Sequence, residues 1–293
     1  MAQTSEGHGS FHRLPWHDFD ALAKLEGDAS MVRRLRRAER SRRKLLLRAL
    51  LEETSKSPEL SGPLPPLDTA WELLARVEGR SSKALDRLLT HPYTGSWAGY
   101  TTRLLRNGTD GIAPLWIHLG HLHALAAAAA IKAGLDFELA VPAWNGHISL
   151  PSLGMARLNA SPPFSVATVR GENGRYTVSN DDTTVHLPDP LETDATGWWS
   201  VRRVRTRVGS HRFSLRLDDL DPYRGLYEPL PPQRLEAAEI DDWQRLIDEA
   251  CELIVTHLPA FAESMPVGLQ SLVPKPQVLF RNPSASTGEA FGS

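Results

Sequence analysis

The stretch IAPLWIHLGHLHALAAAAAIKAGLDFELAV, residues 112–141, decides the fold, because the pattern of apolar residues changes within it. Residues 112–131 are almost continuously apolar, with Pro114 near the start and Gly134 after the end, which predicts a buried helix. After Gly134, short runs of strand-forming residues separated by Gly, Asn and Asp turns replace the helical spacing. We therefore expect a helical half before Gly134 and a half rich in strands after it.

Apolar residues recur at helical spacing before this stretch and predict further helices. These helices are expected over residues 16–24, 29–51, 67–77, 81–89 and 97–106. Ser81 or Ser82 is the expected N-cap of the helix over 81–89, and residues 91–95 are expected to form a turn. Residues 57–66 are rich in Pro, Ser and Gly and predict a linker. The buried stripe of the second helix is expected to comprise Met31, Leu35, Ala38, Leu45, Leu46 and Ala49.

Strands are expected after Gly134 over residues 136–141, 146–150, 164–169, 175–178, 183–187, 199–208 and 212–217. In the last of these, Phe213, Leu215 and Leu217 alternate with basic or polar residues, which predicts a half-buried antiparallel strand. A Pro-rich connection then precedes a long helix over residues 232–258. Residues 278–280 predict a short final strand.

The order of these elements predicts an α+β fold, with a helical N-terminal half followed by antiparallel strands, a long helix and a final strand. Three regions are expected: N-terminal helices and a linker in residues 1–62, a helical region in 63–135 and an α+β region in 136–293. The strand and loop after residue 276 lead into no further element. We therefore expect the last region to be incomplete at its C-terminus.

The composition is that of a folded protein rather than a disordered one, with 41% hydrophobic and 23% charged residues among 293. The formal net charge of −2 gives no global attraction to nucleic acid or to a membrane surface. Residues 1–13 lack the apolar core of a signal peptide, and histidines interrupt the apolar segment 112–131. The single cysteine, Cys251, excludes an intramolecular disulfide and a CxxC zinc site. We expect a cytoplasmic protein that does not enter a membrane.

His118 and His121 are the candidate metal ligands of the apolar segment. They are three residues apart on one helical face, close enough to share a metal ion, whereas His123 points elsewhere. A metal site needs a third ligand, and no carboxylate lies in the same helix. Histidines of the core or of a subunit contact are the simpler interpretation, so we expect no metal site here.

Clustered carboxylates at Asp218, Asp219 and Asp221 could bind a hard cation. They lack the glycine and the distal glutamate of an EF-hand loop. Formation of turns and capping of helices or strands explain them more simply. Residues 180–182, Asn-Asp-Asp, are expected to form a hairpin turn for the same reason.

The helix expected over residues 29–51 is strongly basic. Nine basic residues could follow the phosphates of a nucleic acid or hold an acidic peptide. They surround the helix, however, and glutamates offset part of their charge, so a solvated helix is expected and nucleic-acid binding is not. The basic residues are Arg33, Arg34, Arg36, Arg37, Arg40, Arg42, Arg43, Lys44 and Arg48.

Several catalytic motifs are absent from the sequence. It contains no phosphate-binding Gly-x-x-x-x-Gly-Lys-Ser/Thr loop, no Gly-x-Ser-x-Gly nucleophile elbow and no His-Glu-x-x-His. Cys251 lies midway along the long helix among apolar residues and is expected to be a small core residue rather than a nucleophile. No catalytic residue is therefore expected in this chain.

Short pieces between about residues 85 and 293 carry a resemblance to a known family. The pieces are His91-Pro92 with Trp97-Ala98, Leu119-Gly120-His121-Leu122 followed by the Ala-rich residues 124–130, Val141-Pro142, Leu150-Pro151-Ser152-Leu153-Gly154, Trp198-Trp199 with Val201-Arg202, and residues 284–293. They resemble the actinobacterial HExxH-motif proteins of ribosomal peptide maturation. That family is also called the α-ketoglutarate HExxH-type peptide β-hydroxylases.

The resemblance implies an iron(II)- and α-ketoglutarate-dependent oxygenase that acts on a precursor peptide. In that family the segment similar to residues 286–293 leads into a strand and then a helix bearing His-Glu-x-x-His. This chain ends before that position, so no catalytic or cofactor-binding residue transfers to it. We therefore expect the N-terminal part of such a peptide-modifying protein, inactive by itself. A non-catalytic module that binds a peptide or associates with nucleic acid is the alternative.

Overall fold

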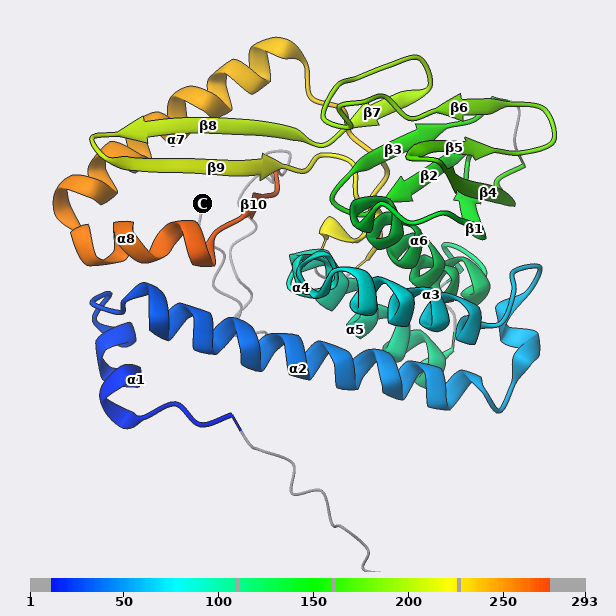
Figure 1. The fold of residues 1–293 in the computed structure, drawn as a ribbon, viewed down its shortest axis with the longest axis horizontal. Helices are drawn as coiled ribbons and strands as arrows, with labels where there is room; N and C mark the ends of the chain where they lie inside the picture. The colour runs from blue at the N-terminus through cyan, green and yellow to red at the C-terminus, as the bar shows by residue number, and fades with distance from the viewer. Residues whose placement is uncertain (1–11, 109–110, 160–161, 226–227, 275–293) are drawn as a thin grey trace, which may run out of the picture.

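The structure, a computed structural model, describes residues 12–108, 111–159, 162–225 and 228–274. Helices fill the first half of the described chain, and strands, two further helices and a short last strand follow, so the expected α+β fold is confirmed (Figure 1). The α-helices of the first half are α1 (Trp16–Ala23), α2 (Ala29–Thr54), α3 (Leu67–Arg80), α4 (Ser82–Leu89), α5 (Pro92–Asn107) and α6 (Leu115–Ala133).

Side-chain caps and prolines set where these helices begin. The side chain of Asp28 accepts hydrogen bonds from the N–H groups of Ser30 and Met31 at the start of α2. Ser81 caps α4, as expected, by accepting from the N–H of Ala84. The expected turn over residues 91–95 was wrong, because α5 already begins at Pro92. Proline suits the first helical position, where its missing N–H would have no helical partner.

Helix α6 forms the centre of the molecule. Every residue from Ile117 to Ile131 is buried, since α3, α4 and α5 pack on one side and the first strand on the other. Gly134 ends the helix in the left-handed conformation, with φ 67°, and its N–H bonds back to Ala130 and Ile131. In the part of the chain that the structure describes, no helix is long and apolar enough to cross a membrane.

A seven-stranded antiparallel sheet covers α6 in the order β6-β5-β4-β1-β2-β3-β7. Gly154 opens β3, a strand that the sequence pattern did not predict. A Cβ at Gly154 would lie 2.2 Å from the carbonyl oxygen of Trp199, so a side chain here would push β3 away from β7. The strands are β1 (Phe137–Trp144), β2 (His147–Leu150), β3 (Gly154–Arg157), β4 (Phe164–Glu172), β5 (Arg175–Ser179), β6 (Thr184–His186) and β7 (Trp198–Ser200).

A smaller sheet of β8 (Arg202–Val208), β9 (His211–Leu217) and β10 (Ser271–Leu272) follows, in the order β10-β9-β8. Helices α7 (Ala237–His257) and α8 (Pro259–Gly268) cover one face of it (Figure 1). Phe213, Leu215 and Leu217 point into this core with Ile247 and Cys251, which confirms the half-buried strand. Helix α2 extends beneath both halves, from α8 at one end to α3 at the other.

One further expectation differs from the structure, and another falls on residues that the structure does not describe. The single strand expected over residues 199–208 is two strands in different sheets, separated at buried Val201, whose N–H bonds to the carbonyl of Leu153. The final strand expected at residues 278–280 lies outside the described residues, and β10 is the last strand that the structure describes.

The expected buried stripe of α2 was also wrong. Leu35 and Leu45 are 44% and 67% exposed, and the buried residues of α2 are Leu47, Leu50 and Thr54. Arginine side chains occupy the inward face of the N-terminal half of this helix and contact α4, α5 and α8. Because long arginine side chains can bury their stems while their charged ends bond to oxygens, an inward helix face need not be apolar.

Candidate functional site

A basic groove of about 720 Å³ follows α2 where this helix faces α4 and α8. We call it the α2 groove. Its walls carry five arginines of one helix but a single carboxylate, Asp86. The lining residues are Ser30, Arg33, Arg34, Arg36, Arg37, Arg40, Asp86, Thr90, Pro266, Val267 and Gln270.

Three of these arginines are fixed by contacts within the protein. Arg36 donates to Thr90 Oγ1 at 2.8 Å and to the carbonyl of Val267. Arg40 donates to both carboxylate oxygens of Asp86, at 2.7 and 2.8 Å, and Arg34 pairs with buried Asp18. The expectation of a merely solvated helix is therefore wrong for this part of α2.

Arg33 and Arg37 differ from these three, because both are exposed and no side-chain hydrogen bond or ion pair to another described residue holds them. Their guanidinium groups are exposed at the edge of the α2 groove. The other three arginines of this groove are held in place by internal contacts. Such a surface can bind an incoming anion without first breaking internal contacts.

The β8–β9 hairpin has one apolar face and one basic face. Its register places Arg203 opposite Arg216, Arg205 opposite Ser214, and Arg207 opposite Arg212. Successive residues of a strand point to opposite faces, so these six side chains share the face turned away from α7. Like charges directly opposite each other destabilise a sheet. The hairpin therefore carries a concentration of positive charge that its own strands do not neutralise.

A second cavity, of about 360 Å³, lies between this hairpin, α4 and the C-terminal end of α6. We call it the Lys132 pocket. The ammonium group of Lys132 donates to the hydroxyl of Ser152. The lining residues are Ser81, Lys83, Ala84, Arg87, Lys132, Ser152, Leu153, Asp189, Pro190, Leu191, Glu192, Val201, Arg203 and Arg216.

The pKa values of the basic groups in the Lys132 pocket reflect crowding of positive charge. Burial, followed by the charges of Arg216, Arg87 and Arg203, lowers the pKa of Lys132 to about 7. Burial and then the neighbouring Arg203 and Arg87 also lower the pKa of Arg216. Glu192, a carboxylate of the pocket wall, is a weak partner, since it lies 3.9 Å from Arg203 and is more than half exposed. The charge of Asp218 partly offsets the lowering of the pKa of Arg216.

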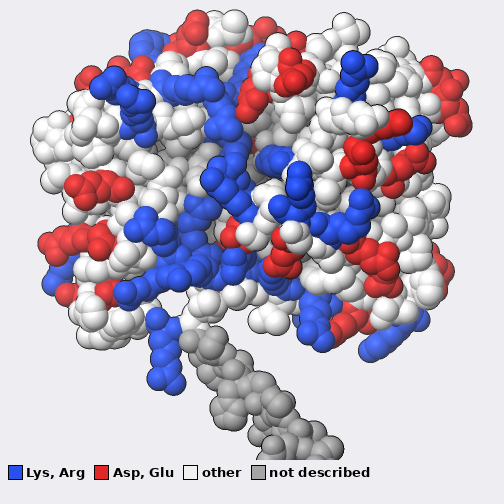
Figure 2. All heavy atoms as spheres, in the orientation of Figure 1, with Lys and Arg blue, Asp and Glu red and all other residues white. Residues whose placement is uncertain are grey.

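The α2 groove and the Lys132 pocket belong to one positively charged surface. Figure 2 shows Lys and Arg side chains as a continuous band from the β8–β9 hairpin down to α2. Helix α4 connects the two cavities, because Asp86 and Thr90 line the first and Arg87 lines the second. The whole chain has a formal charge of −2, so the band reflects segregation of charge and not a general excess.

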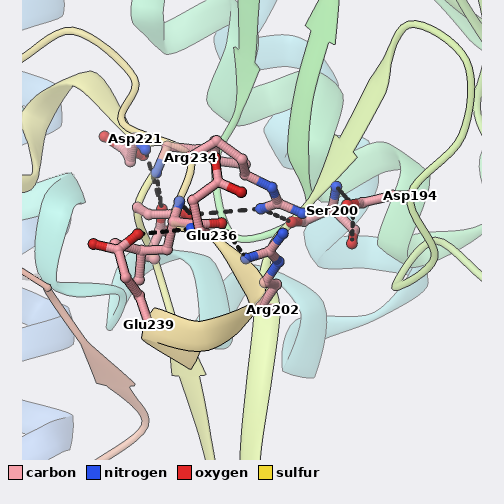
Figure 3. A network of polar contacts seen from close by, with 11 residues as sticks. Asp194, Ser200, Arg202, Asp221, Arg234, Glu236 and Glu239 are labelled. Atoms are coloured by element: carbon pink, nitrogen blue, oxygen red, sulfur yellow. Dashed lines mark hydrogen bonds and ion pairs between the residues drawn. The ribbon is translucent and has the colours of Figure 1, made fainter. Parts of the chain in front are cut away.

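A network of polar contacts fixes the hairpin relative to the large sheet (Figure 3). Arg234 donates to Asp194 at 2.7 Å and to the carbonyl of Ser200, at the end of β7, at 2.8 Å. Arg202, the first residue of β8, donates to the carbonyl of Leu235 at 2.6 Å. These bonds hold the junction of the two sheets, and the walls of the Lys132 pocket come from both sides of that junction.

The acidic cluster serves as a set of caps, as expected. Asp218 accepts from the N–H groups of Leu220 and Asp221, and Asp221 accepts from the N–H of Tyr223. Asp219 accepts from the N–H of Leu235 at 2.9 Å. Burial raises the pKa of Asp218 and that of Asp221. Each of the three carboxylates caps backbone N–H groups through one oxygen, and all three residues are buried, so they do not form an exposed cation site.

The hairpin turn expected at residues 180–182 is also present, because the side chain of Asn180 accepts from the N–H groups of Asp182 and Thr183. Cys251 is buried in the core of the smaller sheet, with 1% of its surface exposed, and burial raises the pKa of its thiol. A buried thiol with a raised pKa is a packing residue and not a nucleophile.

His118 and His121 lie inside the core, surrounded by aromatic rings. The Nδ1 atom of His118 is 3.0 Å from the hydroxyl of Tyr223, and its ring contacts those of Tyr100 and Trp144. The ring of His121 packs against Tyr223, with 4.6 Å between centroids. Burial, and then the charge of His118, lowers the pKa of His121 to about 3. Both imidazoles are therefore packed in the core, and that of His121 is uncharged at neutral pH.

The iron site that the family resemblance implies does not fit these residues. Within the described ranges, no group of three or more His, Cys, Asp or Glu side chains could hold a metal ion. His118 and His121 come from one helix, and the rings beside them supply no carboxylate ligand. We therefore derive no reaction through iron or α-ketoglutarate.

The sequence pattern singled out the arginines of α2 as a candidate site and predicted both strands of the hairpin, but it missed the basic face of the hairpin and Lys132. A signal was present in residues 202–208, Arg-Arg-Val-Arg-Thr-Arg-Val, where arginine recurs at every second position. The pairing of this run with Arg212 and Arg216 depends on the register of two strands, and Lys132 joins them only through tertiary packing.

Comparisons with protein-family models, with curated proteins and with solved structures found no match to this chain.

Proposed function

We propose that this chain is a peptide-binding module whose basic band holds an acidic segment of a partner polypeptide. The observation that supports the proposal most directly is the basic face of the β8–β9 hairpin, where arginines oppose arginines and the chain supplies few carboxylates. Positive surfaces attract acidic partners at long range and orient them on approach. A bound carboxylate-rich segment would relieve the repulsion between the paired arginines.

The residue types of the band favour a peptide over a nucleic acid. Single-stranded nucleic acids bind proteins by stacking bases on aromatic side chains, and none of the described residues that line the two cavities is aromatic. In the α2 groove, Arg34, Arg36 and Arg40 are already engaged by Asp18, Thr90 and Asp86. Only Arg33 and Arg37 of that groove are then left for a run of phosphates. An extended peptide needs only separate contacts for individual carboxylates.

The resemblance to peptide β-hydroxylases leads to a related proposal about the substrate. If the chain is part of a protein that modifies a precursor peptide, the basic band would hold that peptide and another segment would supply the chemistry. The described residues would then bind the precursor peptide and not the iron, because they do not fit the implied metal site. We propose a cytoplasmic location, which the single cysteine favours.

Fluorescence anisotropy with a short labelled Glu-rich peptide tests the proposal. A peptide with Gln at the Glu positions, oligothymidylate and duplex DNA are the comparisons. We expect saturable binding of the Glu-rich peptide, weakened by about tenfold in the variant Arg37→Gln/Arg205→Gln, because each exposed charged contact contributes up to about 1 kcal/mol. Arg42→Gln is the matched control, since Arg42 bonds to Glu39 and lines neither cavity.

Two results would reject the peptide-binding proposal. One is equal binding of the Gln peptide and the Glu peptide, which would show that the arginines do not recognise carboxylates. The other is tighter binding of either nucleic acid than of the Glu peptide at the same salt concentration, with a steep dependence on salt. The second result would favour the nucleic-acid alternative.

A further inference from the structure

The Lys132 pocket brings together cationic groups from four separate segments of the chain. Arg87 comes from α4, Lys132 from the last turn of α6, and Arg203 and Arg216 from neighbouring positions of β8 and β9. Ser152, from the loop between β2 and β3, adds a hydroxyl that accepts a hydrogen bond from Lys132. Residues so distant in sequence meet only because the fold holds them there.

Internal ion pairs do not account for this cluster. Among the described residues, the guanidinium groups of Arg87 and Arg216 have no hydrogen-bonding or ion-pair partner within 4.0 Å. Asp189 and Glu192 line the pocket but are exposed, and Glu192 is 3.9 Å from Arg203. Arg87 is exposed, whereas Lys132 and Arg216 are half-buried. Half-buried cations normally have closely paired carboxylates, and an external anion would supply the charge that Lys132 and Arg216 lack.

We propose that the Lys132 pocket is a binding site for a compact oxyanion, the carboxylate or phosphate-type group of a ligand, held by Arg87, Lys132, Arg203 and Arg216. Guanidinium groups present parallel N–H donors that match the oxygens of such an anion, and an ammonium group adds a point charge. The cavity volume of about 360 Å³ accommodates a small ligand rather than a long chain. This inference does not depend on the peptide-binding proposal, because a free small anion would satisfy it as well.

The low pKa of Lys132 gives the site a dependence on pH. An anion beside Lys132 favours the protonated amine, so binding raises the pKa of Lys132 from about 7. Affinity is therefore expected to fall as pH rises through 7. The other charged and titratable groups around the amine are Lys83 and Arg87 of α4, His91 before α5, Arg203 of β8, Arg216 of β9, and Asp189 and Glu192 of the loop before β7.

Isothermal titration calorimetry of the full chain with sulfate tests the site, because the charge of sulfate is constant over the relevant pH range. Inorganic phosphate is the second probe, and chloride at equal ionic strength is the blank. We expect one saturable sulfate site, weakened at least about tenfold by Arg216→Met and by Lys132→Met. Methionine keeps an apolar stem of similar length, so the variants remove charge with little loss of packing. Arg42→Met, which also removes one positive charge, should bind sulfate as the wild-type chain does.

The outcome separates the proposal from general electrostatic attraction. Absence of saturable binding of both probes, or equal weakening by Arg42→Met, would overturn it. If Arg216→Met does not fold, as judged by circular dichroism, Arg216→Lys and Lys132→Met carry the test, and unchanged affinity in both would also overturn it. The pH profile adds a second readout: affinity should fall above pH 7 in the wild-type chain and stay flat in Lys132→Met.

A competition experiment then identifies the source of the oxyanion. If saturating sulfate displaces a bound Glu-rich peptide from the wild-type chain but not from Lys132→Met, the pocket holds a carboxylate of the peptide. If sulfate and the peptide bind together, the pocket holds a separate small ligand. Sulfate binding without any peptide binding would retain the oxyanion site and reject the peptide-binding proposal, so the two proposals fail separately.

Discussion

Arg203 and Arg216 lie directly opposite each other on neighbouring antiparallel strands, with both side chains on the wall of the Lys132 pocket. Opposed like charges lower the stability of a sheet, and a chain that keeps such a pair needs a compensating interaction. The weak contact of Arg203 with Glu192 at 3.9 Å provides little of it. The pair therefore connects the energetics of the fold with the proposed ligand.

Arg216→Met is expected to stabilise the protein when no multivalent anion is present. Removing one member of the opposed pair should raise the free energy of unfolding by up to about 1 kcal/mol, because it removes the repulsion across the strands. Urea unfolding at low ionic strength measures the change. The gain should disappear in saturating sulfate, where the wild-type chain gains more stability from the ligand than the variant does. A loss of stability at low salt would contradict this explanation.

The stability of the wild-type chain relative to Lys132→Met should rise with pH. Lys132 has a pKa of about 7 in the folded protein, below its ordinary value of 10.5. Between these values the unfolded chain binds a proton that the folded chain does not, so stability increases with pH. Below about pH 7 the full cost of burying the charged amine is present. Urea unfolding of both proteins across this range is the measurement, and a difference that stays constant would reject the low pKa.

Arg43→Ala should destabilise the protein by about 2–4 kcal/mol, because the loss leaves buried acceptors without a donor. Arg43 is only 12% exposed and donates to the carbonyls of Leu89 and His91, which join α2 to the start of α5. Arg42→Ala is the control, since Arg42 contacts the same Glu39 but is 65% exposed. Its change should remain within about 0.5 kcal/mol. Equal effects of the two substitutions would show that Arg43 does not fasten α2.

Gly154→Ala should destabilise the large sheet by more than about 2 kcal/mol. The new methyl group would lie 2.2 Å from the carbonyl oxygen of Trp199, so β3 and β7 would have to separate. Gly174→Ala is a comparison without steric contact, because a Cβ there meets nothing within 4 Å although φ is 75°. Thermal unfolding of both variants separates the clash from the backbone strain that they share. A smaller loss for Gly154→Ala than for Gly174→Ala would contradict the expected clash.

The purified chain is expected to bind iron(II) or zinc only weakly, and without dependence on His121. His121 lies among aromatic rings with an uncharged imidazole, and the described residues form no group of three ligands. Metal titration of the wild-type chain and of His121→Gln is the measurement. Stoichiometric metal that is lost in His121→Gln would reject this expectation and would identify the pair His118 and His121 as a metal site.

Local sequence patterns predicted most of the elements, because helical and strand spacing depend on neighbouring residues. The continuous apolar run of 112–131 predicted α6, and the alternation in 212–217 predicted β9 with its buried face. The capping role of Asp218 and Asp221 also followed from residue type, since short carboxylates bond to nearby N–H groups. Pro92 suits both a turn and the first position of a helix, and the observed α5 begins there, a few residues before the predicted start at residue 97.

The candidate site could not be predicted from local sequence patterns, because it depends on contacts between residues that are distant in the sequence. Arg40 bonds to Asp86, which lies 46 residues away in the sequence. The contact belongs to a face of α2 that points inward, although its charged residues predict exposure to solvent. The pairing of Arg203 with Arg216 is a property of strand register, which a hairpin turn and the core on the other face select together.

The sequence by itself thus determined the α+β order of elements and the burial of α6. Only the tertiary structure decided that Lys132, at the end of α6, meets Arg87, Arg203 and Arg216 in one pocket. The physical reason is that helix and strand propensities act over a few residues, whereas the crowding of like charges arises from packing of whole elements.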